Sequence, residues 1–134
     1  MARPLLWKTL KPNTQVVLAW SSMKLIEAYI PAEALYEVQD VLAECGIDEL
    51  VASEVAVEVG YERQRLGSER AKFVPQLKLE MAVADDQAQN AANQIFKTAD
   101  KGQGKRRIQI LIGRLEQVVR IEAGQRNFAA PQPA

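Results

Sequence analysis

The sequence has 134 residues, and its 17 basic and 17 acidic side chains give zero formal net charge. This length is typical of one domain with a buried core, and the neutral balance argues against non-specific nucleic-acid binding. It has no histidine and one cysteine, which excludes histidine-based catalysis and an internal disulfide and disfavours a zinc or copper site. Because no apolar run reaches the roughly 18–20 residues of a membrane span, we expect a cytoplasmic protein without direct membrane insertion.

Residues 1–22 differ from the rest of the chain, because Pro4 and Pro12 interrupt any regular secondary structure there and only Gln15–Trp20 has a strand pattern. They form an N-terminal extension with three interpretations: a flexible arm, an added edge strand or oligomer arm, or a start codon assigned too early. The sequence leaves these interpretations open.

The next stretch alternates strand and helix patterns. Apolar alternation predicts a strand over Lys24–Ile30, and helical spacing predicts a helix over Ala32–Cys45, with Gly46 as its C-terminal cap. Alternation resumes from Leu50 to Val59, which predicts a second strand. This order of elements begins a β-α-β pattern.

A highly charged segment, Glu62–Lys72, separates that strand from the next. Its length and low apolar content predict an exposed, mobile connection, the kind of loop that often carries function. A third strand is predicted over Gln76–Val83. Its inward register holds Leu77, Leu79, Met81 and Val83, and its outward register holds Gln76, Lys78 and Glu80.

Asp85–Asp86 are expected to cap a second helix. Apolar residues at helical spacing predict the face it buries: Ala88, Ala91, Ala92, Ile95, Phe96 and Ala99. Alternation then predicts a strand over Ile108–Ile112 and a short one over Val118–Ile121. Residues 125–134 are rich in alanine and proline and are expected to be a disordered tail.

The resulting order, β-α-β-β-α-β, predicts a ferredoxin-like α+β fold with an antiparallel sheet and the helices on one face. The other face is then bare. Apolar residues are assigned to the register opposite the core: Leu25, Ala52, Ala56, Ala82 and Leu111. Copies of the same chain are the simplest cover for such a face, so we expect a homo-oligomer.

A loop rich in glycine and basic residues joins the second helix to the following strand. Gly102 and Gly104 free backbone N–H groups to approach an anion, and Lys105, Arg106 and Arg107 supply positive charge. The loop is either a phosphate or nucleotide site or a solvated basic turn, and the pattern alone does not separate the two.

Seven segments together resemble the PII signal-transduction proteins. They are MKLIEAYI at 23–30, LYEVQDVLAECGI at 35–47, SEV at 53–55, FVPQLKLE at 73–80, VADD at 83–86, KTA at 97–99 and VVRIEAG at 118–124. The resemblance covers residues 23–124. It implies a homotrimer that binds ATP or ADP in clefts between subunits and signals through a long T-loop, which docks on a membrane transporter or metabolic enzyme.

Carried onto this chain, the resemblance places the T-loop at 60–74, and we assign partner docking there to Gly60, Tyr61, Arg63, Arg65 and Arg70. It adds Arg120 to the nucleotide-binding residues. Two positions depart from the family pattern, because Gln76 replaces a ligand-binding lysine and Glu122 replaces a second arginine. The loop is also shorter than the family's and lacks the tyrosine that is commonly uridylylated.

The leading hypothesis is therefore a divergent PII-like regulator of nitrogen or inorganic-carbon metabolism. Its regulatory ligand would be ATP, ADP or AMP. It would use no cofactor, and it would not bind nucleic acid. The alternative is a trimeric interaction module that has lost nucleotide binding. No residue set for catalysis is visible, so we do not expect an enzyme.

Overall fold

The computed structural model describes residues 6–9, 15–63, 65–102, 104 and 106–123. In chain order the elements are β1 (Leu6–Thr9), β2 (Gln15–Trp20), β3 (Met23–Ile30), the 3-10 turn η1 (Ala32–Ala34), α1 (Leu35–Glu44), β4 (Val51–Arg63), β5 (Glu69–Ala84), the 3-10 turn η2 (Asp85–Gln87), α2 (Ala88–Asp100), β6 (Gln109–Leu115) and β7 (Val118–Ala123).

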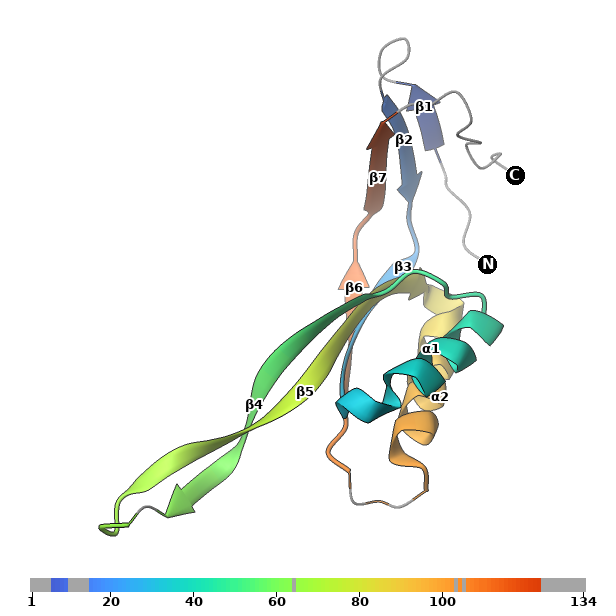
Figure 1. The fold of residues 1–134 in the computed structure, drawn as a ribbon. Helices are drawn as coiled ribbons and strands as arrows, with labels where there is room; N and C mark the ends of the chain where they lie inside the picture. Colours follow the sequence, from blue (N-terminus) through green and yellow to red (C-terminus); the bar gives the residue numbers. More distant parts are fainter. Residues whose placement is uncertain (1–5, 10–14, 64, 103, 105, 124–134) are drawn as a thin grey trace.

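The main sheet has the strand order β4-β5-β3-β6, with every neighbour antiparallel. Helices α1 and α2 lie side by side on one face of this sheet (Figure 1). This is the split βαβ arrangement of a ferredoxin-like α+β fold, and it confirms the predicted fold class.

The core lies between the helices and the sheet. Its largest fully buried side chains come from both layers: Ile26, Ile30, Leu42, Leu79, Ile95 and Val38. Small residues such as Ala91 and Ala99 let α2 approach the sheet closely, as the helical spacing predicted. Phe96 is the exception in that stripe, because it is 48% exposed. The buried face of α2 is therefore narrower than predicted.

The helix ends match the sequence signals in one case and not in the other. After α1, Ile47 N–H donates to Leu42 O and Gly46 N–H to Ala43 O, each at 2.9 Å, so Gly46 ends the helix as predicted. The prediction that Asp85–Asp86 cap α2 was wrong. These residues form the 3-10 turn η2, and neither η2 nor α2 has a side-chain cap bond, although the charges still favour the helix dipole.

Strand register corrects the assignment of two alanines to the open face. Residues directly opposed across an antiparallel pair point to the same side. Ala52 is paired with Leu79, which is buried under the helices, so Ala52 and likewise Ala56 belong to the helix side. Val51 instead shares the open side with Leu111, and both side chains are exposed.

The open face also carries charge at its centre. Lys78 Nζ lies 3.7 Å from a carboxylate oxygen of Glu27 on β3 and 3.7 Å from one of Glu80 on its own strand. Glu27 and Glu80 are directly opposed. Attraction to Glu27 and then to Glu80 raises the pKa of Lys78 above its ordinary value of 10.5. The lysine thus separates two like charges.

The described residues of the charged segment Glu62–Lys72 are exposed, as predicted, but both ends of the segment are strand, because β4 extends to Arg63 and β5 begins at Glu69. β4 and β5 continue as a two-stranded arm, paired from Gly60 opposite Lys72 to Arg63 opposite Glu69, and the arm projects away from the helices (Figure 1). The arm contains few apolar residues because neither of its faces is covered by another described element, but its two strands still pair through their backbones.

A second sheet, with the order β1-β2-β7, lies at the opposite end of β3 and β6 from the arm (Figure 1). β2 coincides with the strand predicted at Gln15–Trp20, and it pairs with β7 along its whole length. β1 was not predicted. Among the interpretations of residues 1–22, the paired arrangement corresponds to an added strand. At the other end of the chain, the tail expected at 125–134 lies outside the described residues.

Candidate functional site

The loop from α2 to β6 turns through left-handed backbone. Lys101, Gly102 and Gly104 have φ angles of 55°, 71° and 66°. Glycine favours this conformation because it has no Cβ. Gly104 N–H donates to the carboxylate of Asp100, 3.0 Å from Oδ1 and 3.2 Å from Oδ2. Asp100 is itself buried. The Gly104 amide, which was predicted to approach an anion, is therefore already bonded to a carboxylate inside the chain.

Two basic side chains of this loop, Lys101 and Arg106, face acids of η1 and α1. Lys101 Nζ lies 2.9 Å from Glu37 Oε1, and Arg106 Nη2 lies 3.8 Å from Glu33 Oε1. Arg106 Nη1 also donates to Ala99 O at 3.3 Å. These pairs are partly exposed, so they are exchangeable in water. An anion at this loop must therefore compete with Glu33 and Glu37.

Gln76 lies beside the same loop, on β5. It was predicted to point outward, but it is only 6% exposed, and its Nε2 donates to Arg107 O at 2.7 Å. The amide thus fixes the end of the basic loop against the sheet, which explains its burial. Its Oε1 is buried and has no hydrogen-bond partner among the described residues.

A pocket of about 440 Å³ adjoins the loop. It is lined by Pro31, Ala32, Glu33, Glu54, Val74, Pro75, Gln76 and Leu77. Glu33 and Gln76 bond to the loop as well as lining the pocket, so the two features are contiguous. The volume is within the range of small-molecule sites.

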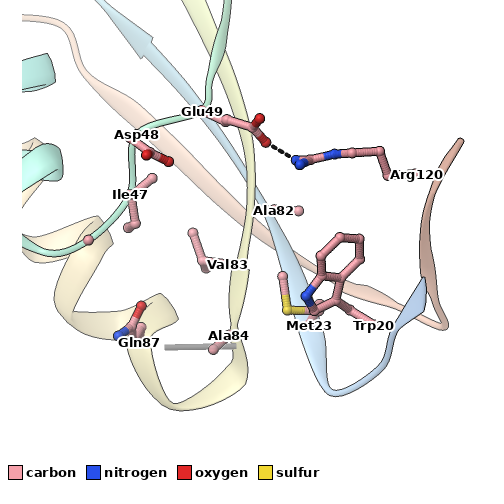
Figure 2. A pocket seen from close by; sticks show the side chains of 11 residues that line it. Trp20, Met23, Ile47, Asp48, Glu49, Ala82, Val83, Ala84, Gln87 and Arg120 are labelled. Carbon is pink, nitrogen blue, oxygen red and sulfur yellow. Dashed lines mark hydrogen bonds and ion pairs between the residues drawn. The ribbon is translucent and has the colours of Figure 1, made fainter. Parts of the chain in front are cut away.

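Arg120, on β7, is part of a different pocket of about 150 Å³ (Figure 2). Its guanidinium forms an ion pair and hydrogen bond with Glu49, and its Cζ lies 5.4 Å from the centroid of the Trp20 ring. Met23 and Ala82 also line this pocket. Sequence reasoning missed Trp20 and Glu49, because nothing in their local pattern links them to Arg120.

Within one chain, the predicted nucleotide-binding residues do not form one site. Gly102, Gly104, Arg106 and Arg107 belong to the loop before β6, whereas β7 lies beyond the far end of β6 (Figure 1). The seven residues of β6 alone extend roughly 20 Å at about 3.3 Å per residue. Lys105 lies outside the described residues.

The residues assigned to partner docking are on the arm. Gly60, at a register shift after Glu58, has a φ of 131°. Tyr61, Arg63, Arg65 and Arg70 are exposed, and Glu62 is opposite Arg70. Leu66, in the turn at the tip, is 96% exposed. The arm therefore presents arginines and isolated apolar side chains to solvent.

Two other kinds of feature are missing from the described part of the chain. Its His, Cys, Asp and Glu side chains form no group of three or more that could hold a metal ion. Neither of the helices described there has the length and apolar character needed to cross a membrane.

Comparison with known proteins identifies the family. The model of the family "Nitrogen regulatory protein P-II" matches residues 23–125. The chain is 36% identical over 118 residues to the nitrogen regulatory protein P-II of Microchaete diplosiphon and 31% identical over 118 residues to GlnK of Escherichia coli (strain K12). Each match covers 81% of this chain and 99% of the relative.

The fold has a solved counterpart, the crystal structure of Arabidopsis thaliana PII bound to citrate. The TM-score is 0.56 with 21% sequence identity, and the match covers 72% of this chain and 77% of that one. The family consists of regulatory signal transducers, not enzymes. The chain therefore belongs to the nitrogen regulatory protein P-II family.

Proposed function

We propose that this protein is a cytoplasmic, homotrimeric regulator that binds an adenine nucleotide in the clefts between its subunits. The observation that carries the proposal is the separation of its basic groups. The loop at 101–107 precedes β6, and Arg120 follows it at the far end. A neighbouring copy that placed its Arg120 beside this loop would gather both sets of cations around one polyphosphate.

The open face of the main sheet supports assembly. Val51 is 62% exposed and Leu111 is 46% exposed, and both lie on the face that the helices leave bare. Burying such apolar area against another copy is favourable, and a closed ring covers every copy equally. We therefore assign this face to contacts between subunits.

The chemistry of the loop supports an anionic ligand. Arg106 and Arg107 lie beside backbone turned by Gly102 and Gly104, and the adjacent pocket of about 440 Å³ has room for a small molecule. The related Arabidopsis PII was crystallised with citrate, a polyanion. We propose ATP, ADP or AMP as the ligand here, held by Gly102, Gly104, Lys105, Arg106, Arg107 and the Arg120 of a second subunit.

The output of this regulator is proposed to be its arm. Ligand contacts beside Gln76, near the base of the arm, would shift the population of arm conformations and so change the surface seen by a partner. The exposed Arg63, Arg65 and Arg70 would provide the contacts. The partner is proposed to be a transporter or enzyme of nitrogen or inorganic-carbon metabolism.

The alternative is a trimeric interaction module without nucleotide binding. Asp100 already accepts from the Gly104 amide, and Glu33 and Glu37 face Arg106 and Lys101. Glu122 stands two residues from Arg120 on β7. These acids oppose an anion and favour this second function.

Calorimetry with the full chain separates the two functions. We expect ATP, ADP or AMP to bind, and we expect Arg107→Ala to weaken that binding about tenfold, the effect of losing one charged hydrogen bond. Arg114→Ala is the matched control, because Arg114 is exposed on β6 and is not part of the proposed site. If ATP, ADP, AMP and cyclic AMP all fail to bind, the nucleotide-binding function is rejected and the interaction module is left as the remaining proposal.

A further inference from the structure

The N-terminal hairpin brings an aromatic side chain to Arg120. The P-II family model matches from residue 23 onward, so β1 and β2 lie outside the matched region. β2 pairs along β7 with Leu18 opposite Arg120 and Trp20 opposite Val118. The hairpin therefore places Trp20 in the Arg120 pocket as part of a continuous sheet.

Arg120 is engaged from two directions. Figure 2 shows its side chain extending to Glu49 on the segment between α1 and β4, and its Cζ lies 5.4 Å from the centroid of the Trp20 ring. The carboxylate and the aromatic face engage the guanidinium in two favourable ways, by an ion pair and by a cation–π contact. Arg120 thus occupies a defined intrachain position.

That position is only moderately stable. The side chain of Glu49 is 67% exposed and that of Arg120 is 38% exposed, and exposed ion pairs are weak and readily exchanged. A phosphate group carries more charge than a carboxylate and offers three acceptor oxygens, so it competes well for the same guanidinium. Glu49 can therefore hold Arg120 without preventing its use by a ligand.

We propose that Glu49 and Trp20 form an intrachain latch on Arg120, which nucleotide phosphate must displace before Arg120 can contribute to the cleft. This inference rests on the proposed function. The latch makes Glu49 a competitor of the ligand, and it couples occupancy of the nucleotide site to the contact between Arg120 and the added hairpin.

Removing the charge of Glu49 tests the competition. We expect Glu49→Gln to bind ATP three- to fivefold more tightly in calorimetry, the effect of losing one exposed ion pair. Asp48→Asn is the matched control, because Asp48 lines the same pocket but forms no ion pair with the described cations. The control should change affinity less than twofold.

The outcomes separate the latch from the nucleotide site. If the parent binds ATP and Glu49→Gln binds it equally or more weakly, or if Asp48→Asn tightens binding as much as Glu49→Gln does, the latch is overturned and the proposed function stands. If neither the parent nor the variants bind a nucleotide, both proposals fail together.

A second measurement follows Arg120 itself. Trp7 and Trp20 are the tryptophans of the sequence, so Trp7→Phe leaves Trp20 as the only source of tryptophan emission. We expect saturating ATP to shift the emission of Trp20 in this variant, because Arg120 leaves the ring face. An emission spectrum that does not change at saturating ATP, while calorimetry shows binding, would overturn the latch.

Discussion

The buried carboxylate of Asp100 organises the basic loop. It accepts from Gly104 N–H at 3.0 Å and is 7% exposed, so the bond is charge-assisted and shielded. We predict that Asp100→Ala lowers the free energy of unfolding by about 1.5–3 kcal/mol, measured by urea denaturation. Asp40→Ala, an exposed change on α1, should shift it by less than about 0.5 kcal/mol. Equal effects of the two changes would show that the Asp100 bond is unimportant.

Lys78 has a different role, the separation of Glu27 and Glu80. Replacing it with methionine leaves two like charges directly opposed, so we predict a lower denaturation midpoint for Lys78→Met than for Lys24→Met. The pKa of Lys78 is raised in the folded protein, so its stabilising effect is complete below pH 10.5 and is lost as pH rises through the folded pKa.

The direction of this pKa shift allows the prediction for Lys78→Met to be tested by a second measurement. The difference in midpoint between the parent and Lys78→Met should shrink above pH 10.5, where the lysine loses its charge, and in high salt, which screens the two pairs. A difference that persists unchanged under both conditions would indicate lost packing of the lysine side chain instead of lost charge.

Among the elements, the arm depends most on one backbone position. The φ of 131° at Gly60 lies in a region that is essentially limited to glycine. We predict that Gly60→Ala opens the arm locally, seen as faster amide exchange from residue 60 to the tip, while the denaturation midpoint of the core stays constant.

Gly113→Ala provides the control for Gly60→Ala. Gly113 is in β6, it is absent from the described residues with positive φ, and an added Cβ there would meet no atom within 4 Å. It should leave exchange in the arm unchanged. Slow exchange retained in Gly60→Ala would show that the bulge tolerates a side chain.

The elements also show what sequence periodicity can predict. The spacing in α2 and the alternation in β3 report directly on a single buried face, and both were predicted to within a few residues. The arm was missed because its pairing depends on strand continuation, not on burial. The surroundings of Arg120 were missed because Glu49 is 71 residues away in sequence. Glu49 and Arg120 become neighbours only when the chain is folded.

The basic loop shows the same limit of sequence periodicity. Its glycines and arginines were visible in the sequence, but Glu33 comes from η1 and Glu37 from α1, and their pairing with the loop depends on how α1 packs beside α2. Gln76 was assigned outward from strict alternation. Its burial instead follows from the Arg107 carbonyl that it binds.

For the whole molecule, the proposed assembly depends on the open face of the sheet. Leu111 is exposed there at 46%, and a lysine in its place would have to be desolvated in the interface, a cost that pairing with the opposed Glu27 does not fully offset. We predict that Leu111→Lys converts the proposed trimer to monomers in light scattering, whereas Leu66→Lys at the arm tip leaves that trimer intact. Monomeric parent protein would contradict the proposed assembly.

The central claim is that each nucleotide cleft combines the basic loop of one subunit with Arg120 of another. Mixed trimers test it most directly, because a chain with Arg106→Ala and Arg107→Ala retains Arg120, and a chain with Arg120→Ala retains the loop. Each variant alone should bind ATP weakly. Unfolding and refolding an equal mixture should restore parental affinity at about a quarter of the clefts, the fraction that random assembly gives. If the mixture binds no better than its components, the cleft does not combine groups from two subunits.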